Sequence, residues 1–326
     1  MSTRARIATV CQGGRHENSV EKNRDCVMGL LDAALREKPD LVCLPEAFAI
    51  VGLGDLPLEE RAETVPGPTT DAAARRAREH RAYVICPLKM KRAGRVWNSA
   101  VILDRAGQIA GVYDKVCPVT SSPDYTVLEG GVTPGTEVPV FDLDFGRIGI
   151  QICFDLGFAE NWSTLGEKRA QLVFWPSAYD GGFPLRAFAY IHHYYVVSSV
   201  RHGTSRIIDP LGAILQETAP GVPVIWRDIN LDFVAAHFDF NHSIPAAIRT
   251  TYGNRVEVRE SAPGSGHFLV EPIDPGLTCE QLQREFGFES TREYHDRHRT
   301  AFPHLRAGRP APPQPAAHGN RAQYSP

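Results

Sequence analysis

The segment from Gly146 to Asp155 constrains the fold most, because a buried-looking apolar run ends there at a cysteine. Three isoleucines alternate with a glycine and a glutamine before Cys153, which is the pattern of a strand buried on at least one face. Apolar spacing resumes at Phe158 and predicts a helix, so Cys153 is expected on a strand-to-helix turn. Nucleophiles are often held on such turns beside free backbone N–H groups. A cysteine after an apolar run can also be a small buried hydrophobe, because free cysteine is among the most buried residue types.

Cysteine usage and charge narrow the class of protein. The 326 residues include seven cysteines that form no Cys-x-x-Cys pair, which argues against a disulfide framework or a thiolate zinc site and favours a reducing compartment. The net charge of −3 gives no electrostatic footprint for nucleic acid or an anionic membrane. The N-terminus lacks the apolar core of a signal peptide, and no stretch approaches a membrane span. We therefore expect a cytoplasmic protein that acts on a small molecule.

Strands and helices follow one another in a mixed order through most of the chain. Strands are predicted over residues 6–10, 41–46, 83–88, 97–103, 109–113, 138–143, 146–152, 172–176, 194–199 and 205–215 (a hairpin), with the last clear strand over 224–231. Helices are predicted over residues 18–35, 71–80 and 184–193, as well as from 158 onward. Two sheets packed on each other, with helices outside, accommodate this order.

The C-terminal part of the sequence has a different composition. One helix is predicted over residues 277–286, and a proline-rich polar tail that cannot form a core begins at Pro310. No linker precedes residue 270 or so. We therefore expect one domain over residues 1–273 and a C-terminal extension over 274–326 that is partly disordered at its end.

Two charged residues stand at predicted strand ends, and each allows two interpretations. Glu46 follows Pro45, which ends the strand because proline has no N–H to donate. Glu46 is then either a solvated loop carboxylate or a functional one. Lys115 ends the hairpin at 97–113 and is either a snorkelling surface residue or a functional cation. The turn-rich loop at 118–136 is long enough to suggest a function.

Several motifs together resemble the nitrilase superfamily of carbon–nitrogen hydrolases. They are Leu41-Val-Cys-Leu-Pro-Glu46, Tyr113-Asp-Lys115, Glu129 before Pro134-Gly135, Gly149-Ile-Gln-Ile-Cys153-Phe-Asp155, Trp175-Pro-Ser-Ala178 and Gly203-Thr-Ser-Arg-Ile-Ile-Asp-Pro-Leu-Gly212. They occur in the family's order over residues 4–235 or so. The resemblance implies a four-layer α-β-β-α sandwich of the nitrilase type and a Glu-Lys-Cys catalytic set, with no metal or organic cofactor.

The resemblance also implies a role for each matching residue. Cys153 would attack an amide-type carbon while Glu46 takes its proton, because a thiol is a poor nucleophile until it is deprotonated. Lys115 and the amide of Phe154 would stabilise the oxyanion. Glu46 would then protonate the leaving nitrogen and activate water against the thioester. Glu129, which resembles the family's second glutamate, would orient Lys115 and the substrate nitrogen.

Departures from the family pattern bear on the substrate. Nitrile-hydrolysing members have Trp-Glu after the cysteine, whereas this chain has Phe154-Asp155, which is more similar to the amide- and carbamoyl-hydrolysing branches. We therefore expect a hydrolase of a small linear amide that releases ammonia or an amine. An N-carbamoyl (ureido) amidohydrolase is the alternative. A nitrilase, an acyltransferase and a non-catalytic scaffold fit the sequence less well.

The remaining expectations concern substrate contacts and assembly. Tyr179 and Arg186 are expected to shape the pocket with Phe154, and an arginine there could hold a substrate carboxylate. His192 and His193 are not expected to bind a metal, because adjacent residues on a helix point in different directions. Family members usually assemble as dimers or larger, so we expect at least a homodimer.

Overall fold

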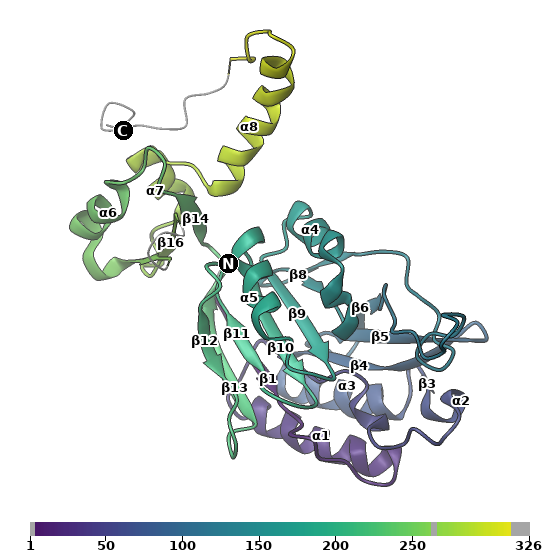
Figure 1. Ribbon diagram of the computed structural model, residues 1–326. Coiled ribbons are helices and arrows are strands. Elements are labelled where there is room, and N and C mark those ends of the chain that lie inside the picture. Colours follow the sequence, from purple (N-terminus) through teal and green to yellow (C-terminus); the bar gives the residue numbers. More distant parts are fainter. Residues whose placement is uncertain (1–3, 262–265, 314–326) are drawn as a thin grey trace. The chain divides into compact units, whose positions relative to one another are not determined.

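The computed structural model describes residues 4–261 and 266–313, and they form two compact units. The first unit spans residues 4–229 and the second begins at Asn230 (Figure 1). Each unit has a hydrophobic core of its own. The predicted boundary at residue 273 falls inside the second unit, and the hydrolase domain over 1–273 stays a prediction.

The first sheet of the 4–229 unit combines parallel and antiparallel strands. Its order is β13-β1-β2-β4-β5-β6, with β3 paired to β4, and its strands are β1 (Arg4–Val10), β2 (Leu41–Cys43), β3 (Glu63–Thr64), β4 (Tyr83–Arg92), β5 (Arg95–Leu103), β6 (Ile109–Asp114) and β13 (Val224–Asn230). Strands β1, β2 and β4 run parallel, as expected for strands that helices connect. The predicted hairpin is confirmed as β5 and β6, which pair antiparallel.

The second sheet carries the predicted cysteine strand. Its order is β12-β11-β10-β9-β8-β7, and its strands are β7 (Val140–Leu143), β8 (Gly146–Ile150), β9 (Leu172–Ser177), β10 (Tyr195–Val200), β11 (Arg206–Ile208) and β12 (Ile214–Glu217). Strands β8, β9 and β10 are parallel, so their carboxyl ends meet at one edge of the sheet. Cys153 follows β8 at this edge.

Helices cover the outer face of each sheet. Those of the 4–229 unit are α1 (Val20–Leu35), α2 (Leu58–Arg61), α3 (Pro68–His80), α4 (Ala159–Glu167) and α5 (Gly182–His192). Ser19 caps α1 by accepting a hydrogen bond from the backbone N–H of Lys22. The apolar faces of α1 and α3 pack on the first sheet, and those of α4 and α5 pack on the second. Figure 1 shows the helices outside the two sheets.

Buried hydroxyl groups join the two sheets across their inner faces. Thr9 Oγ1 donates to the Ser198 carbonyl at 2.7 Å, and Ser199 Oγ lies 2.9 Å from the carbonyls of both Val10 and Cys43. These contacts satisfy polar groups that would otherwise be costly to bury. The predicted four-layer α-β-β-α arrangement is confirmed.

The unit that begins at Asn230 contains a small sheet and three α-helices among its described residues. They are β14 (Val234–His237), β15 (Val256–Glu260), β16 (His267–Pro272), α6 (Ile244–Tyr252), α7 (Cys279–Phe286) and α8 (Thr291–Arg306). The predicted helix at 277–286 is confirmed as α7. The prediction that residues 224–231 form the last clear strand is wrong, because three short antiparallel strands follow. The predicted disorder at the end of the tail lies outside the described residues.

Among the residues that the structure describes, no helix has both the length and the apolar character that crossing a membrane requires.

Candidate active site

Cys153 lies on a strained turn just after β8. It is the first residue of a 3₁₀ helix, η2 (Cys153–Gly157), and its φ is +49°, in the left-handed region that side chains rarely adopt. The indole N–H of Trp175 donates to the Cys153 carbonyl at 3.0 Å and holds the turn. Gly149 on β8 allows α4 to approach, since a Cβ there would lie 2.6 Å from Leu165. The predicted strand-to-helix turn is therefore confirmed.

Lys115 stands between two carboxylates. Its Nζ lies 3.1 Å from Glu46 Oε1 and 2.5 Å from Glu129 Oε1. Lys115 is 1% exposed and Glu46 is 5% exposed, so this pair is almost fully removed from solvent. This burial excludes a solvated loop carboxylate for Glu46 and a snorkelling surface lysine for Lys115, because either group would keep its charge in water.

Glu129 reaches these residues from the loop at 118–136. Its φ is +44°, and its Oε1 also accepts from the Val119 N–H at 3.3 Å. Within the described part of the chain, the loop carries turns and isolated bridges but no helix or strand. The long loop thus brings a third charged residue to Glu46 and Lys115.

Three polar residues that the sequence analysis did not identify complete the cluster. Lys89 on β4 pairs with Glu129 Oε2, and Asn98 on β5 donates to both Glu46 at 2.7 Å and Glu129 at 3.0 Å. Arg201, which follows β10, lies 3.8 Å from Glu46. Of these three residues, Lys89 could have been found from the sequence. It is a charged residue at a position of β4 where the alternation of the strand predicts an apolar side chain.

Asp155 links the cysteine turn to the segment around Lys115. Its buried carboxylate accepts from the Tyr113 hydroxyl at 2.7 Å, the Cys117 N–H at 2.8 Å and the Ile152 N–H at 2.8 Å. Tyr113 and Cys117 lie two residues on either side of Lys115, whereas Ile152 precedes Cys153. One carboxylate therefore fixes the two segments relative to each other.

The charges favour a neutral thiol beside ionised carboxylates. Burial raises the pKa of Cys153 to about 11, with a further contribution from Glu46, although Lys115 opposes it. Burial disfavours ionisation of Glu46, but Lys115 and Arg201 outweigh it and lower the pKa of that carboxyl. Burial likewise opposes ionisation of Glu129, yet Lys89 and Lys115 lower its pKa to about 2. The Ala178 N–H and the Ser177 hydroxyl lower the pKa of Cys153 and so favour its thiolate.

The predicted substrate contacts lie in different settings. Phe154 and Tyr179 are 41% and 44% exposed, and the Tyr179 ring packs edge-on against Trp175 at 5.3 Å. Tyr179 also lies close enough to Cys153 for that thiol to raise its pKa, although burial contributes more. Arg186 on α5 instead donates from Nε to the Gly212 carbonyl at 2.8 Å. The roles of all three in substrate binding stay predictions.

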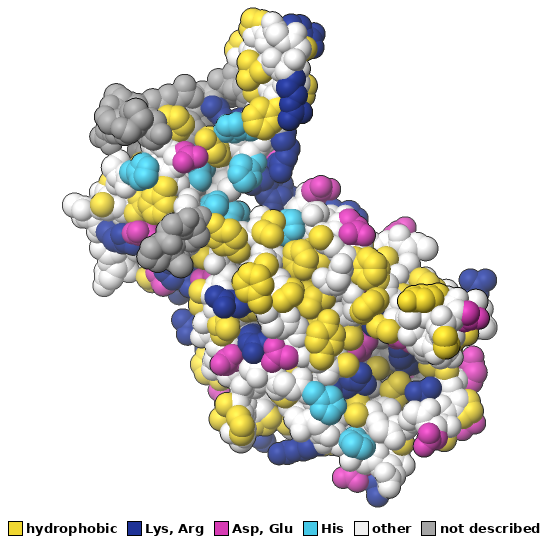
Figure 2. Space-filling model, in the orientation of Figure 1, with side chains coloured by type: hydrophobic (Ala, Val, Ile, Leu, Met, Phe, Trp, Pro, Cys, Tyr) yellow, Lys and Arg dark blue, Asp and Glu magenta, His cyan; other side chains and the backbone are white. Residues whose placement is uncertain are grey.

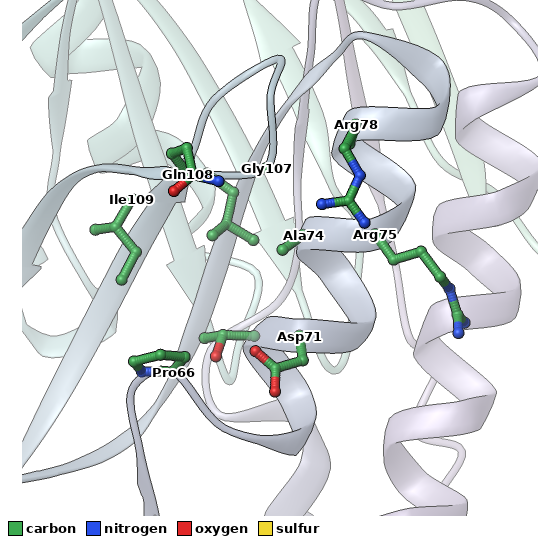
Figure 3. A pocket seen from close by; sticks show the side chains of 10 residues that line it. Pro66, Asp71, Ala74, Arg75, Arg78, Gly107, Gln108 and Ile109 are labelled. Atoms are coloured by element: carbon green, nitrogen blue, oxygen red, sulfur yellow. The ribbon is translucent and has the colours of Figure 1, made fainter.

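A separate pocket of about 580 Å³ lies between α3 and the turn that connects β5 to β6 (Figure 3). Asp71, Ala74, Arg75 and Arg78 line it from α3, and Gln108 faces them from the turn. Its lining includes none of the predicted site residues. We therefore place the candidate active site at the buried charge cluster around Lys115.

Comparison with known proteins finds several relatives of this chain. A nitrilase and fragile histidine triad fusion protein of Caenorhabditis elegans is 27% identical over 72% of this chain and 59% of its own length. The structural match to the crystal structure of that protein covers 71% of this chain and 62% of the crystallised chain, with a TM-score of 0.61 and 26% identity. This chain thus spans less than two thirds of that relative.

Two further relatives have names that describe hydrolases. An omega-amidase of Xenopus tropicalis is 26% identical over 65% of this chain and 84% of its own. A beta-ureidopropionase of Arabidopsis thaliana is 26% identical over 83% of this chain and 64% of its own. The model of the carbon-nitrogen hydrolase family matches residues 7–237. The chain therefore belongs to the carbon-nitrogen hydrolase family, the nitrilase superfamily.

Proposed function

We propose that this protein hydrolyses a small linear amide through a thioester on Cys153 and releases ammonia or an amine. The observation that carries the proposal is the hydrogen-bonded set of Glu46, Lys115 and Glu129 beside the strained cysteine turn. The omega-amidase among the relatives supports amide chemistry. A thiol, a carboxylate base and a buried cation are the groups that this reaction needs.

The first half of the reaction forms the thioester. With the pKa of Cys153 near 11 and that of Glu46 lowered, the resting pair is a thiol and a carboxylate. Glu46 takes the thiol proton as sulfur attacks the carbonyl carbon, and the oxyanion is stabilised by Lys115 Nζ and the Phe154 N–H. Glu46 then gives the proton to the nitrogen as the C–N bond breaks, which leaves the acyl group on sulfur.

The second half of the reaction releases the acid. Glu46 removes a proton from water, the resulting hydroxide attacks the thioester carbon, and the C–S bond breaks as the thiol regains its proton. Lys115 again stabilises the oxyanion. Glu129 holds Lys115 through the 2.5 Å contact, and we assign to it the orientation of the substrate nitrogen.

A ureido substrate is the second candidate, and the beta-ureidopropionase relative favours it. The same bond changes at a carbamoyl carbon release carbon dioxide as well as ammonia and an amine. The two candidates therefore differ in one product that can be measured.

The test is product release from panels of primary amides, N-carbamoyl amino acids and nitriles, with the Cys153→Ala variant as the control. Ammonia that depends on Cys153, without carbon dioxide, supports the amidase. Carbon dioxide from ureido compounds supports the alternative, and turnover of nitriles alone refutes both. Formation of a new amide with an added primary amine, in preference to the free acid, indicates acyl transfer. Full turnover by Cys153→Ala would rule out the mechanism, and a wild type without turnover or acyl adduct would favour a non-catalytic scaffold.

We also propose that the protein forms at least a homodimer. Apolar side chains gather on the face of the 4–229 unit that carries α4 and α5 (Figure 2). They include Phe183, which is 73% exposed, and Ile191, which is 60% exposed. Light scattering on the wild type and on Phe183→Glu tests this, and a monomeric wild type would refute it.

A further inference from the structure

Arg201 is placed beside the active site by the parallel pairing of β9 and β10. Val200 pairs with Ser177 at the carboxyl ends of these strands, and the Arg201 N–H donates to the Ser177 carbonyl at 3.0 Å. The Arg201 carbonyl accepts from the Gly14 N–H at 2.8 Å. These backbone contacts fix Arg201 at the sheet edge where Cys153 follows β8.

The guanidinium group of Arg201 is less well paired than the other cations of the site. Lys89 and Lys115 both hydrogen-bond to Glu129, whereas the contact of Arg201 Nη2 with Glu46 Oε2 is 3.8 Å, beyond hydrogen-bond length. Its Nε is buried and has no hydrogen-bond partner in the described part of the chain. The side chain is only 22% exposed, so it holds a permanent charge with unused donors in a mostly buried place.

A buried donor without a partner carries a desolvation cost that a ligand can remove. Glu46 does not fill this role, because its Oε2, the oxygen that faces Arg201, lies 3.8 Å from Nη2, and its Oε1 already accepts from Asn98 and Lys115. A guanidinium fork matches a carboxylate in a bidentate arrangement better than it matches a neutral amide. The unused donors of Arg201 therefore fit an anionic group of the substrate.

We propose that Arg201 binds the carboxylate of an amide substrate whose scissile amide and carboxylate are separated by a short chain. The inference rests on the proposed amidase function and specifies its substrate class. The spacer must be short because Arg201 and Lys115 both contact the carboxylate of Glu46. Arg186, which the sequence suggested for this task, instead donates its Nε to Gly212.

The test compares two substrate series in four proteins. The acidic series is the half-amides of malonic, succinic and glutaric acid, and the neutral series is straight-chain primary amides of matching length. The proteins are wild type, Arg201→Gln, Arg186→Leu and Arg227→Gln, a control on the exposed face of β13. The readout is the ratio of kcat/KM between the two series, because a residue that only tunes Glu46 would change both series equally.

We expect the wild type to prefer one acidic half-amide, and Arg201→Gln to reduce that preference about 10- to 100-fold, as for a lost hydrogen bond to a charged group. Arg227→Gln should keep the preference. An equal loss on both series, a loss in Arg186→Leu instead, or a wild type without preference would overturn the inference while leaving the amidase proposal intact.

Binding to the Cys153→Ala variant separates this inference from the reaction itself. Calorimetric titration with the preferred half-amide, or with each in turn if none is hydrolysed, should show binding that Arg201→Gln weakens by a similar factor. If binding depends on Arg201 but the protein with Cys153 intact hydrolyses none of the half-amides or neutral amides, the proposed reaction is refuted and the carboxylate site is supported. Equal binding with and without the Arg201 guanidinium would refute the carboxylate site.

Discussion

Replacing Tyr113 with phenylalanine tests the buried contact that joins the cysteine turn to the Lys115 segment. The change keeps the ring and removes one hydrogen bond to the Asp155 carboxylate, 2.7 Å long and fully buried at both ends. A hydrogen bond to a charged group contributes about 1.5–3 kcal/mol. Two backbone N–H donors remain, at Cys117 and Ile152, so the loss should stay below the ~3–5 kcal/mol of a stripped buried charge.

The loss should depend on pH in a direction that follows from Asp155. Burial raises the pKa of Asp155 above its usual 3.8, and Tyr113 opposes that rise by favouring the ionised form. A carboxyl with a raised folded-state pKa loses stability as pH rises from 3.8 through that pKa. Tyr113→Phe should raise the pKa of Asp155 further. The loss in the free energy of unfolding relative to wild type should therefore be small below about pH 4 and complete once Asp155 is ionised in the folded variant.

Urea unfolding followed by tryptophan fluorescence measures this loss in the relevant unit. All four tryptophans lie between residues 4 and 229, at Trp97, Trp162, Trp175 and Trp226. The matched control is Tyr125→Phe, since Tyr125 is 76% exposed and its hydroxyl should contribute little. An unchanged urea midpoint for Tyr113→Phe at pH 7, or a loss of the same size at pH 4, would refute the reasoning.

Two further predictions concern the charges of the site. Lys89→Met should raise the pKa of Glu129 from about 2 and move the acid limb of the kcat/KM profile up by about 1 to 3 pH units, because one of two flanking cations is lost. The control is Lys91→Met on the same strand, because Lys91 is 37% exposed and lies 4.0 Å from its acidic partner, Glu59. It should leave the acid limb unchanged, and equal shifts in both variants would show that Lys89 does not act through Glu129. Lys115→Met should raise the pKa of Cys153 above about 11, because Lys115 lowers it. The pH dependence of Cys153 alkylation, read by mass spectrometry, should show slower reaction below pH 10, and an unchanged or faster rate would show that Lys115 does not stabilise the thiolate.

The parts of the site that lie within one sequence segment were predictable. Alternating isoleucines place Cys153 after a strand because the period of two is a local property of the backbone. The long loop at 118–136 was recognised from its turn residues. The resemblance to a family then singled out Glu46 and Lys115, whose positions alone left their roles open.

The residues that were missed come together through strand register. Lys89 on β4 pairs with Asn98 on β5, and both side chains bind Glu129, which lies in the loop at 118–136. The position of Arg201 beside the site depends on the register in which β10 pairs with β9. Register follows from pairing between distant segments, which one sequence does not reveal. The short strands after residue 231 were missed although β15 alternates valine with charged residues, because runs of only four to six residues give a weak periodic signal.

Backbone strain coincides with the site at three separate turns. Cys153 and Glu129 have positive φ, and so does Ala47, which directly follows Glu46. Such conformations cost about 1–3 kcal/mol each and persist only where surrounding structure holds them. The contacts that hold two of these turns come from elsewhere in the chain, since Trp175 binds the Cys153 carbonyl and Lys115 binds Glu129. The reactive geometry is therefore a property of the packed sheets, and substitutions that loosen those remote contacts should disturb the site even when Glu46, Glu129 and Cys153 themselves are unchanged.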